Sequence, residues 1–243
     1  MPISSVRRRL AGVVAALLAA ALSVVPAAAA PDRCGSAPRS DFVDRDEASK
    51  VHRESIDCVD FVDIANGQVR NGRRFYLPAE PVTRAQMATF IIQTLIAAGY
   101  GDELPSGEAT REDPDEFRDI DDSVHRERIN QLSRIGVATG FPDATYRPGR
   151  TLRRDQMASF LVQAAEWALN RNLEADGGPY FGDVGRNNVH RGNIDTGFEE
   201  ELFNGRRAPR PGDRNSGEFA PDDTVRREQM ASFLTNLLDR VET

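Results

Sequence analysis

The chain is poor in the residues that most catalytic and metal-binding sites require. Its 243 residues include three histidines, two cysteines and one tryptophan. No Gly-x-Ser-x-Gly elbow, Gly-rich phosphate loop or cluster of metal ligands occurs. We therefore expect no cofactor, no metal site and no enzymatic activity. A pair of carboxylates for glycoside cleavage stays a lesser alternative, because the spacing it needs is spatial.

Long apolar runs are also scarce, with one exception at the N-terminus. Three arginines at positions 7–9 precede an apolar run of about fifteen residues, and four alanines at 27–30 follow it, as in a secretory signal peptide. The run is shorter than the roughly twenty residues that a membrane-spanning helix needs. We expect cleavage among the alanines before Pro31, and no transmembrane segment in the mature form.

The chain lacks an excess of positive charge. Three of its 31 basic residues lie in the leader, so the remaining 28 face 38 acidic residues and leave a net charge of −10. A nucleic-acid partner requires a basic face, so the balance argues against one.

The two cysteines, Cys34 and Cys58, lie 24 residues apart. In an exported protein such a pair predicts a disulfide, which would tie an N-terminal arm to the first helix. Two free thiols are the alternative.

The rare residues fall into register, which indicates an internal repeat. Each histidine is followed by Arg, by Ile four residues after the His, and by Gly eleven residues after the Ile. A Phe-x-Asp lies upstream of each histidine, and a proline lies nine residues before the methionine of each Gln-Met-Ala-(Ser/Thr)-Phe. The sets are Phe42, Asp44, His52, Pro78 and Met87; Phe117, Asp119, His125, Pro148 and Met157; Phe181, Asp183, His190, Pro221 and Met230.

Each copy has the periodicity of two amphipathic helices separated by a loop. Met87, Phe90, Ile91 and Leu95 follow helical spacing, as do the corresponding residues of the other copies. A shorter helix precedes each loop, and in the second copy it ends at Gly136. One pair cannot bury its apolar stripe alone, so three copies should close around a shared core. The third copy has an insertion around residues 206–217.

These patterns give a complete division of the chain. We expect a signal peptide at 1–30, an N-terminal arm at 31–41, repeats at 42–98, 117–169 and 181–243, and linkers at 99–116 and 170–180.

The repeats resemble the S-layer homology family. The resemblance rests on Ile135 to Asp143 in family order and on the helix starts Thr83-Arg84-Ala85-Gln86, Arg153-Arg154-Asp155-Gln156 and Arg226-Arg227-Glu228-Gln229. It covers about residues 41–240 and implies an all-α fold of three helix-loop-helix repeats in a pseudo-threefold assembly. Such modules anchor proteins to the cell wall by binding anionic secondary polysaccharides.

The resemblance implies that Arg84, Arg154 and Arg227 contact the ligand. Arg153 and Arg226 stand where the family motif has threonine, and we expect them to add charge to two of the sites. An arginine in the first turn of a helix is independently suited to an anion, because unpaired backbone N–H groups and the helix dipole lie beside it. We thus expect a secreted, cell-surface module whose partner is an anionic wall polysaccharide, with another envelope protein as a further candidate. An envelope scaffold that has lost polymer binding is the alternative, and a wall-sugar hydrolase is a lesser one.

Three other features have two interpretations each. The histidines could converge on the threefold axis as a metal site, but packed, hydrogen-bonded histidines are the ordinary outcome. The Phe-x-Asp motifs should dock each repeat in the core and cap its first helix, with the alternative that Asp44, Asp119 or Asp183 also lines a groove. Trp167 fits core packing better than a platform for sugar.

Overall fold

The computed structural model describes residues 34–213 and 215–242; the expected signal peptide lies outside the described residues. The helices are α1 Arg53–Phe61, α2 Arg84–Leu95, α3 Arg126–Arg134, α4 Arg154–Leu169, α5 Arg191–Glu199 and α6 Arg227–Val241. Short 3-10 turns span Arg45–Glu47, Lys50–His52 and Gly101–Glu103, and a π turn spans Ile96–Tyr100. The described chain is thus mostly helical, as expected, and contains no helix long and apolar enough to cross a membrane.

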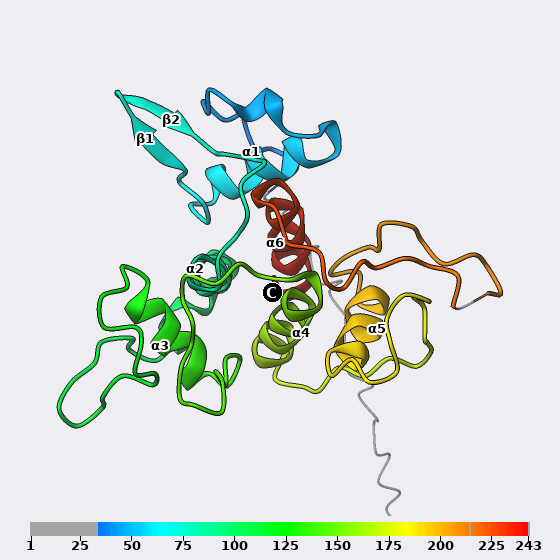
Figure 1. Cartoon of the computed structure of the whole chain (residues 1–243). Helices are drawn as coiled ribbons and strands as arrows, with labels where there is room; N and C mark the ends of the chain where they lie inside the picture. Colours follow the sequence, from blue (N-terminus) through cyan, green and yellow to red (C-terminus); the bar gives the residue numbers. More distant parts are fainter. Residues whose placement is uncertain (1–33, 214, 243) are drawn as a thin grey trace, which may run out of the picture.

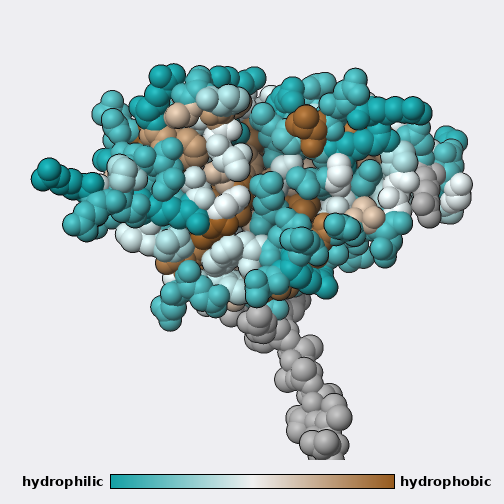
Figure 2. Space-filling model, turned by 90° about the horizontal axis from the view of Figure 1, so that it is seen from below, coloured by the Kyte–Doolittle hydropathy of each residue, from teal (hydrophilic) through white to brown (hydrophobic). Residues whose placement is uncertain are grey.

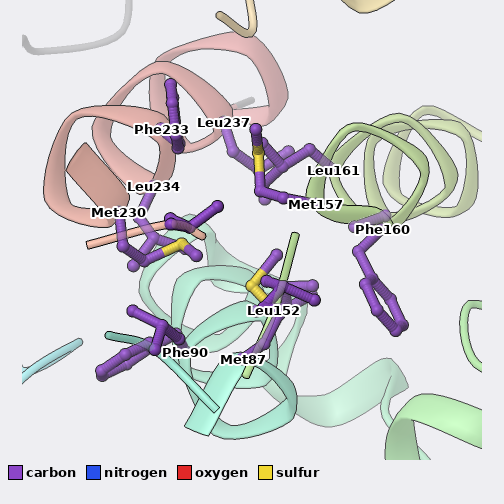
Figure 3. Close-up of a cluster of buried hydrophobic side chains, with 14 of the residues drawn as sticks. Met87, Phe90, Leu152, Met157, Phe160, Leu161, Met230, Phe233, Leu234 and Leu237 are labelled. Carbon is purple, nitrogen blue, oxygen red and sulfur yellow. The ribbon is translucent and has the colours of Figure 1, made fainter. Parts of the chain in front are cut away.

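The long helices α2, α4 and α6 surround the centre of the molecule, and α1, α3 and α5 lie outside them (Figure 1). Met87, Met157 and Met230 are fully buried and point toward one another from the three central helices (Figure 3). The apolar stripes that the sequence predicts therefore form one core.

The outer helices α3 and α5 pack on the central helices that come immediately before them in the chain, α2 and α4, whereas α1 packs on the last helix, α6. The last of these contacts joins the N-terminal and C-terminal parts of the chain. Extended segments before the central helices are joined in the same circular order. The backbone N–H of Val82 donates to the carbonyl of Val225, that of Val225 to the carbonyl of Leu152, and that of Leu152 to the carbonyl of Val82, each at 2.9 Å.

The Phe-x-Asp phenylalanines are buried, as predicted, but the aspartates do not cap the outer helices. Each carboxylate instead accepts the N–H groups of two successive loop residues; Asp119, for example, accepts from Tyr146 and Arg147 at 2.7 and 2.8 Å. The N-cap residues of α1, α3 and α5 are the histidines, which make no side-chain capping bond. The aspartates lie seven or more residues before the helices. Local sequence does not indicate that the carboxylate accepts N–H groups of the loop before the central helix and not those of the outer helix.

A small hairpin corrects the all-α expectation. Strands β1 Gln68–Arg70 and β2 Arg73–Phe75 pair antiparallel in the loop between α1 and α2. The two residues that connect them, Asn71 and Gly72, have φ of 51° and 72°, the left-handed conformation of a tight hairpin turn. An Asn-Gly pair is a strong hairpin signal, so this element was predictable. The corresponding loop after α3, at residues 141–149, has no strand, as expected.

The remaining loops differ in how closely they follow the pattern that the sequence predicts. Gly136 follows α3 with φ of 79°, which confirms the predicted helix stop. The expected linker at 99–116 begins inside a helical turn, because Ile96–Tyr100 and Gly101–Glu103 continue from α2. The described residues of 206–217 form an irregular loop that projects from the body beyond α5 (Figure 1).

Candidate anion-binding grooves

Arg84, Arg154 and Arg227 are the first residues of α2, α4 and α6. Each follows an extended residue, so the chain turns into the helix at the arginine. All three are buried, with exposed fractions of 5%, 4% and 7%. The three motif arginines therefore have the same position at a helix start, and all three lie beneath the surface.

An aromatic residue of a neighbouring segment holds each guanidinium. Nε donates to the backbone carbonyl of that residue, which is Tyr146 for Arg84, at 2.8 Å. The guanidinium carbon also lies 4.6 Å from the centre of the Tyr146 ring, a cation–π contact. The pairs Arg154 with Phe219 and Arg227 with Tyr76 repeat this arrangement.

No carboxylate lies within ion-pair distance of these three arginines among the described residues. Burial lowers the pKa of Arg84. Burial, with the nearby charge of Arg206, lowers the pKa of Arg154 to about 10, which still leaves the guanidinium charged at neutral pH. A buried charge without a counter-ion is costly, so an arriving anion would be stabilised.

A hollow of about 300 Å³ opens beside Arg84. Its walls combine the guanidinium with aromatic rings, amides and hydroxyls; they include Phe141, Phe160, Gln156, Gln163, Asn193, Ser159 and Thr139. Amides and hydroxyls are the groups that hydrogen-bond sugars, and the guanidinium suits a carboxylate or phosphate. The site can therefore bind a saccharide that bears a negative group.

Sequence reasoning missed the polar residues of this hollow. Gln156, Ser159 and Gln163 lie three and four residues apart on α4. That spacing places them on one face, opposite the apolar stripe, where polar residues are usually dismissed as solvated surface.

Arg153 and Arg226 occupy different surroundings from the three buried arginines. Arg153 binds Asp155 and Asp222, at 2.7 and 3.0 Å. Arg226 is exposed and lines a separate hollow with Arg206, and Arg227 is not part of that lining.

The histidines lie on three separate interfaces and do not converge. Nδ1 of His52, His125 and His190 lies 2.7 to 2.8 Å from a hydroxyl of the neighbouring central helix, on Ser232, Thr89 and Ser159 respectively. Each imidazole thus bonds across one helix pair. No group of three or more His, Cys, Asp or Glu in the described part of the chain could hold a metal ion.

Cys34 and Cys58 form the predicted disulfide. Cys58 is buried in α1, so the bond ties the arm to the helix that packs on α6.

These features define a class of protein: a mostly helical domain with three buried arginines, one of which lines a polar hollow. Comparison with protein families agrees, because the model of the S-layer homology domain matches residues 116–158. The match includes α3, the loop after it and the start of α4 with Arg154. Domains of this family generally anchor proteins to the cell wall by binding secondary wall polymers, and they imply association with the cell surface. A search of curated proteins finds no match for the chain.

Proposed function

We propose that the chain is an exported cell-wall-binding module that holds an anionic secondary wall polysaccharide in grooves beside Arg84, Arg154 and Arg227. The observation that carries the proposal is Arg84, a buried guanidinium without a carboxylate partner that faces a hollow lined by amides and hydroxyls. A negative group on a sugar would supply the missing counter-charge, and the neighbouring amides would bind the ring hydroxyls.

We further infer three repeats in a pseudo-threefold assembly. The support extends beyond residues 116–158. The bond from arginine Nε to an aromatic carbonyl, the bond from histidine to hydroxyl and the aspartate clamp each occur at three corresponding places. Chance is a poor explanation for the same contacts at the same spacings.

A sedimentation assay with wall fragments tests the function. The mature chain should bind native wall fragments, and should bind fragments stripped of secondary polymer at least tenfold more weakly. Arg84→Met keeps the side-chain volume but removes the charge and the donors, so it should weaken binding at least tenfold. Arg150→Ala removes one exposed arginine of the adjacent loop, with the same change in net charge, and should alter binding less than twofold.

Two results would contradict the proposal. One is equal binding to native and stripped walls, which would favour a scaffold that has lost polymer binding. The other is unchanged binding by Arg84→Met after circular dichroism has shown that the variant is folded. Turnover of wall sugars would instead reveal a hydrolase.

A further inference from the structure

The polar face of α4 does not end at the Arg84 groove. Gln156, Ser159 and Gln163 are followed on the same face by Trp167, four residues later, and then by Asn170, the residue directly after α4. At a rise of 1.5 Å per residue, this stripe is about 21 Å long, enough for several sugar units.

A second hollow of about 820 Å³ adjoins the first along this stripe. Gln163 lines both, so the two hollows are neighbours along α4. The second is lined on one side by the end of α3 and on the other by the last turn of α4; its lining includes Ile135, Gly136, Glu166, Trp167, Asn170 and Arg171. Hydrophilic residues dominate the molecule seen from below, and hydrophobic residues reach the surface only in patches between them (Figure 2).

Trp167 is the only tryptophan, and it is held in position from one side. It packs edge-to-face on Tyr100, with ring centres 5.8 Å apart. The hydroxyl of Tyr100 donates to the carbonyl of Val241 at 3.0 Å, which fixes that support. Trp167 is only partly buried, so part of the indole faces the hollow. A partly exposed indole that packs on a neighbouring ring can stack on the apolar face of a sugar ring.

The charge of the second hollow differs from that of the first. Glu103 and Glu166 line it together with a single arginine, Arg171, so it has no positive excess. One oxygen of Glu166 accepts the N–H of Leu173 at 2.9 Å, which orients the carboxylate. Carboxylates and amides beside an indole suit neutral sugar hydroxyls rather than a second anion.

We propose that α4 carries an extended saccharide site: the Arg84 groove takes the charged unit, and the Trp167 hollow takes uncharged sugar units adjoining it. This inference rests on the proposed function and adds a subsite to it. The extension is confined to α4, because Ala97 and Arg240 stand at the positions corresponding to Trp167. Arg240, moreover, is bonded to Glu200.

Intrinsic fluorescence tests the site directly, since Trp167 is the only tryptophan. The probes are size-fractionated fragments of native wall polymer, one to five sugar units long, and a neutral N-acetylhexosamine trisaccharide. Fragments of three or more units should shift or quench the emission, whereas single charged units should bind with little change. The neutral trisaccharide should produce the same change at higher concentration.

Variants separate the two subsites by calorimetry. Trp167→Leu keeps an apolar contact with Tyr100 but removes the stacking surface, so it should lower affinity roughly tenfold for long fragments and leave single charged units unaffected. Gln163→Ala should weaken the binding of long fragments more than Gln93→Ala, the corresponding change on α2, because the Trp167 hollow adjoins α4 alone.

The outcomes distinguish the inference from the function beneath it. If long fragments bind but leave the fluorescence unchanged, or if Trp167→Leu and Gln163→Ala bind them normally, the extended site is wrong. Should Arg84→Met still abolish that binding, the proposed function stands without the extension. If neither set of changes matters, both proposals fail.

Discussion

Asp119 and Arg84 have opposite charges, and both bind the backbone of the loop that contains Tyr146. The carboxylate of Asp119 accepts the N–H groups of Tyr146 and Arg147, whereas the guanidinium of Arg84 donates to the carbonyl of Tyr146. Arg147 has φ of 59°, a left-handed conformation that is unfavourable for a residue with a Cβ. The aspartate therefore stabilises a strained turn, and that turn presents the carbonyl that holds the buried arginine.

Replacing this carboxylate should destabilise the fold. Asp119→Ala leaves two N–H groups without their acceptor, so we expect the free energy of unfolding to fall by about 2 kcal/mol. Urea denaturation followed by circular dichroism measures the change. Asp122→Ala removes an exposed carboxylate nearby and should stay within about 0.5 kcal/mol of the parent. Equal effects of the two substitutions would show that the clamp contributes nothing beyond charge.

The central helices begin in unequal ways. At α2, Thr83 and Gln86 form a capping box in which the Thr83 hydroxyl accepts the N–H of Gln86 at 3.2 Å and the Gln86 side chain accepts that of Thr83 at 3.0 Å. At α6, Gln229 still accepts the N–H of Arg226, but arginine has no acceptor to return the bond. With arginine at the position that Thr83 holds before α2, the cap of α6 is therefore only half made.

Substitutions at these starts should change stability in opposite directions. Thr83→Ala removes an acceptor and should lower the free energy of unfolding by about 1 kcal/mol. Arg226→Thr supplies one at an exposed position and should raise it by about 0.5–1 kcal/mol. Thermal and urea denaturation report both changes. A destabilising Arg226→Thr would mean that the arginine itself supports the helix start.

At the scale of the whole molecule, stability depends on closing the circle of helices. Contacts of α1 with α6 join distant parts of the chain, and the disulfide holds α1 to the arm beside it. The three histidines lie on the three outer interfaces, half-buried against hydroxyls. Burial lowers the pKa of each below its ordinary value of 6.5.

This pattern predicts an acid-sensitive assembly. Below about pH 6.5 the unfolded chain binds more protons than the folded one, so the free energy of unfolding should fall as the pH decreases, until the folded histidines are protonated as well. Denaturation at pH 7.5 to 5 measures the slope, and His125→Gln should reduce it by about a third because one of three groups is removed. A parent stability that is constant or rises toward pH 5 would contradict this origin.

We expect the free energy of unfolding to fall further in stronger acid. The hydrogen bond from Arg126 holds the pKa of Asp115 at about 2, below its usual 3.8, so its contribution is lost as the pH falls through that interval.

Local chemistry and spacing determined much of this protein from sequence alone. Periodicity, backbone preference and register are properties of neighbouring residues. They predict the helical stripes, the stop at Gly136, the disulfide and the positions of the motif arginines. The Asn71-Gly72 pair is an equally local signal, and it indicates the hairpin that the all-α expectation lacks.

Only the tertiary structure decided what lies across from each residue. The aspartates accept from a loop some thirty residues away, the arginines are held by rings from another segment, and the histidines bond to other helices. The proximity of two hollows at Gln163 is likewise a property of the packed chain. Such partners depend on how the helices close around the core, and spacing along the sequence does not encode distances between segments.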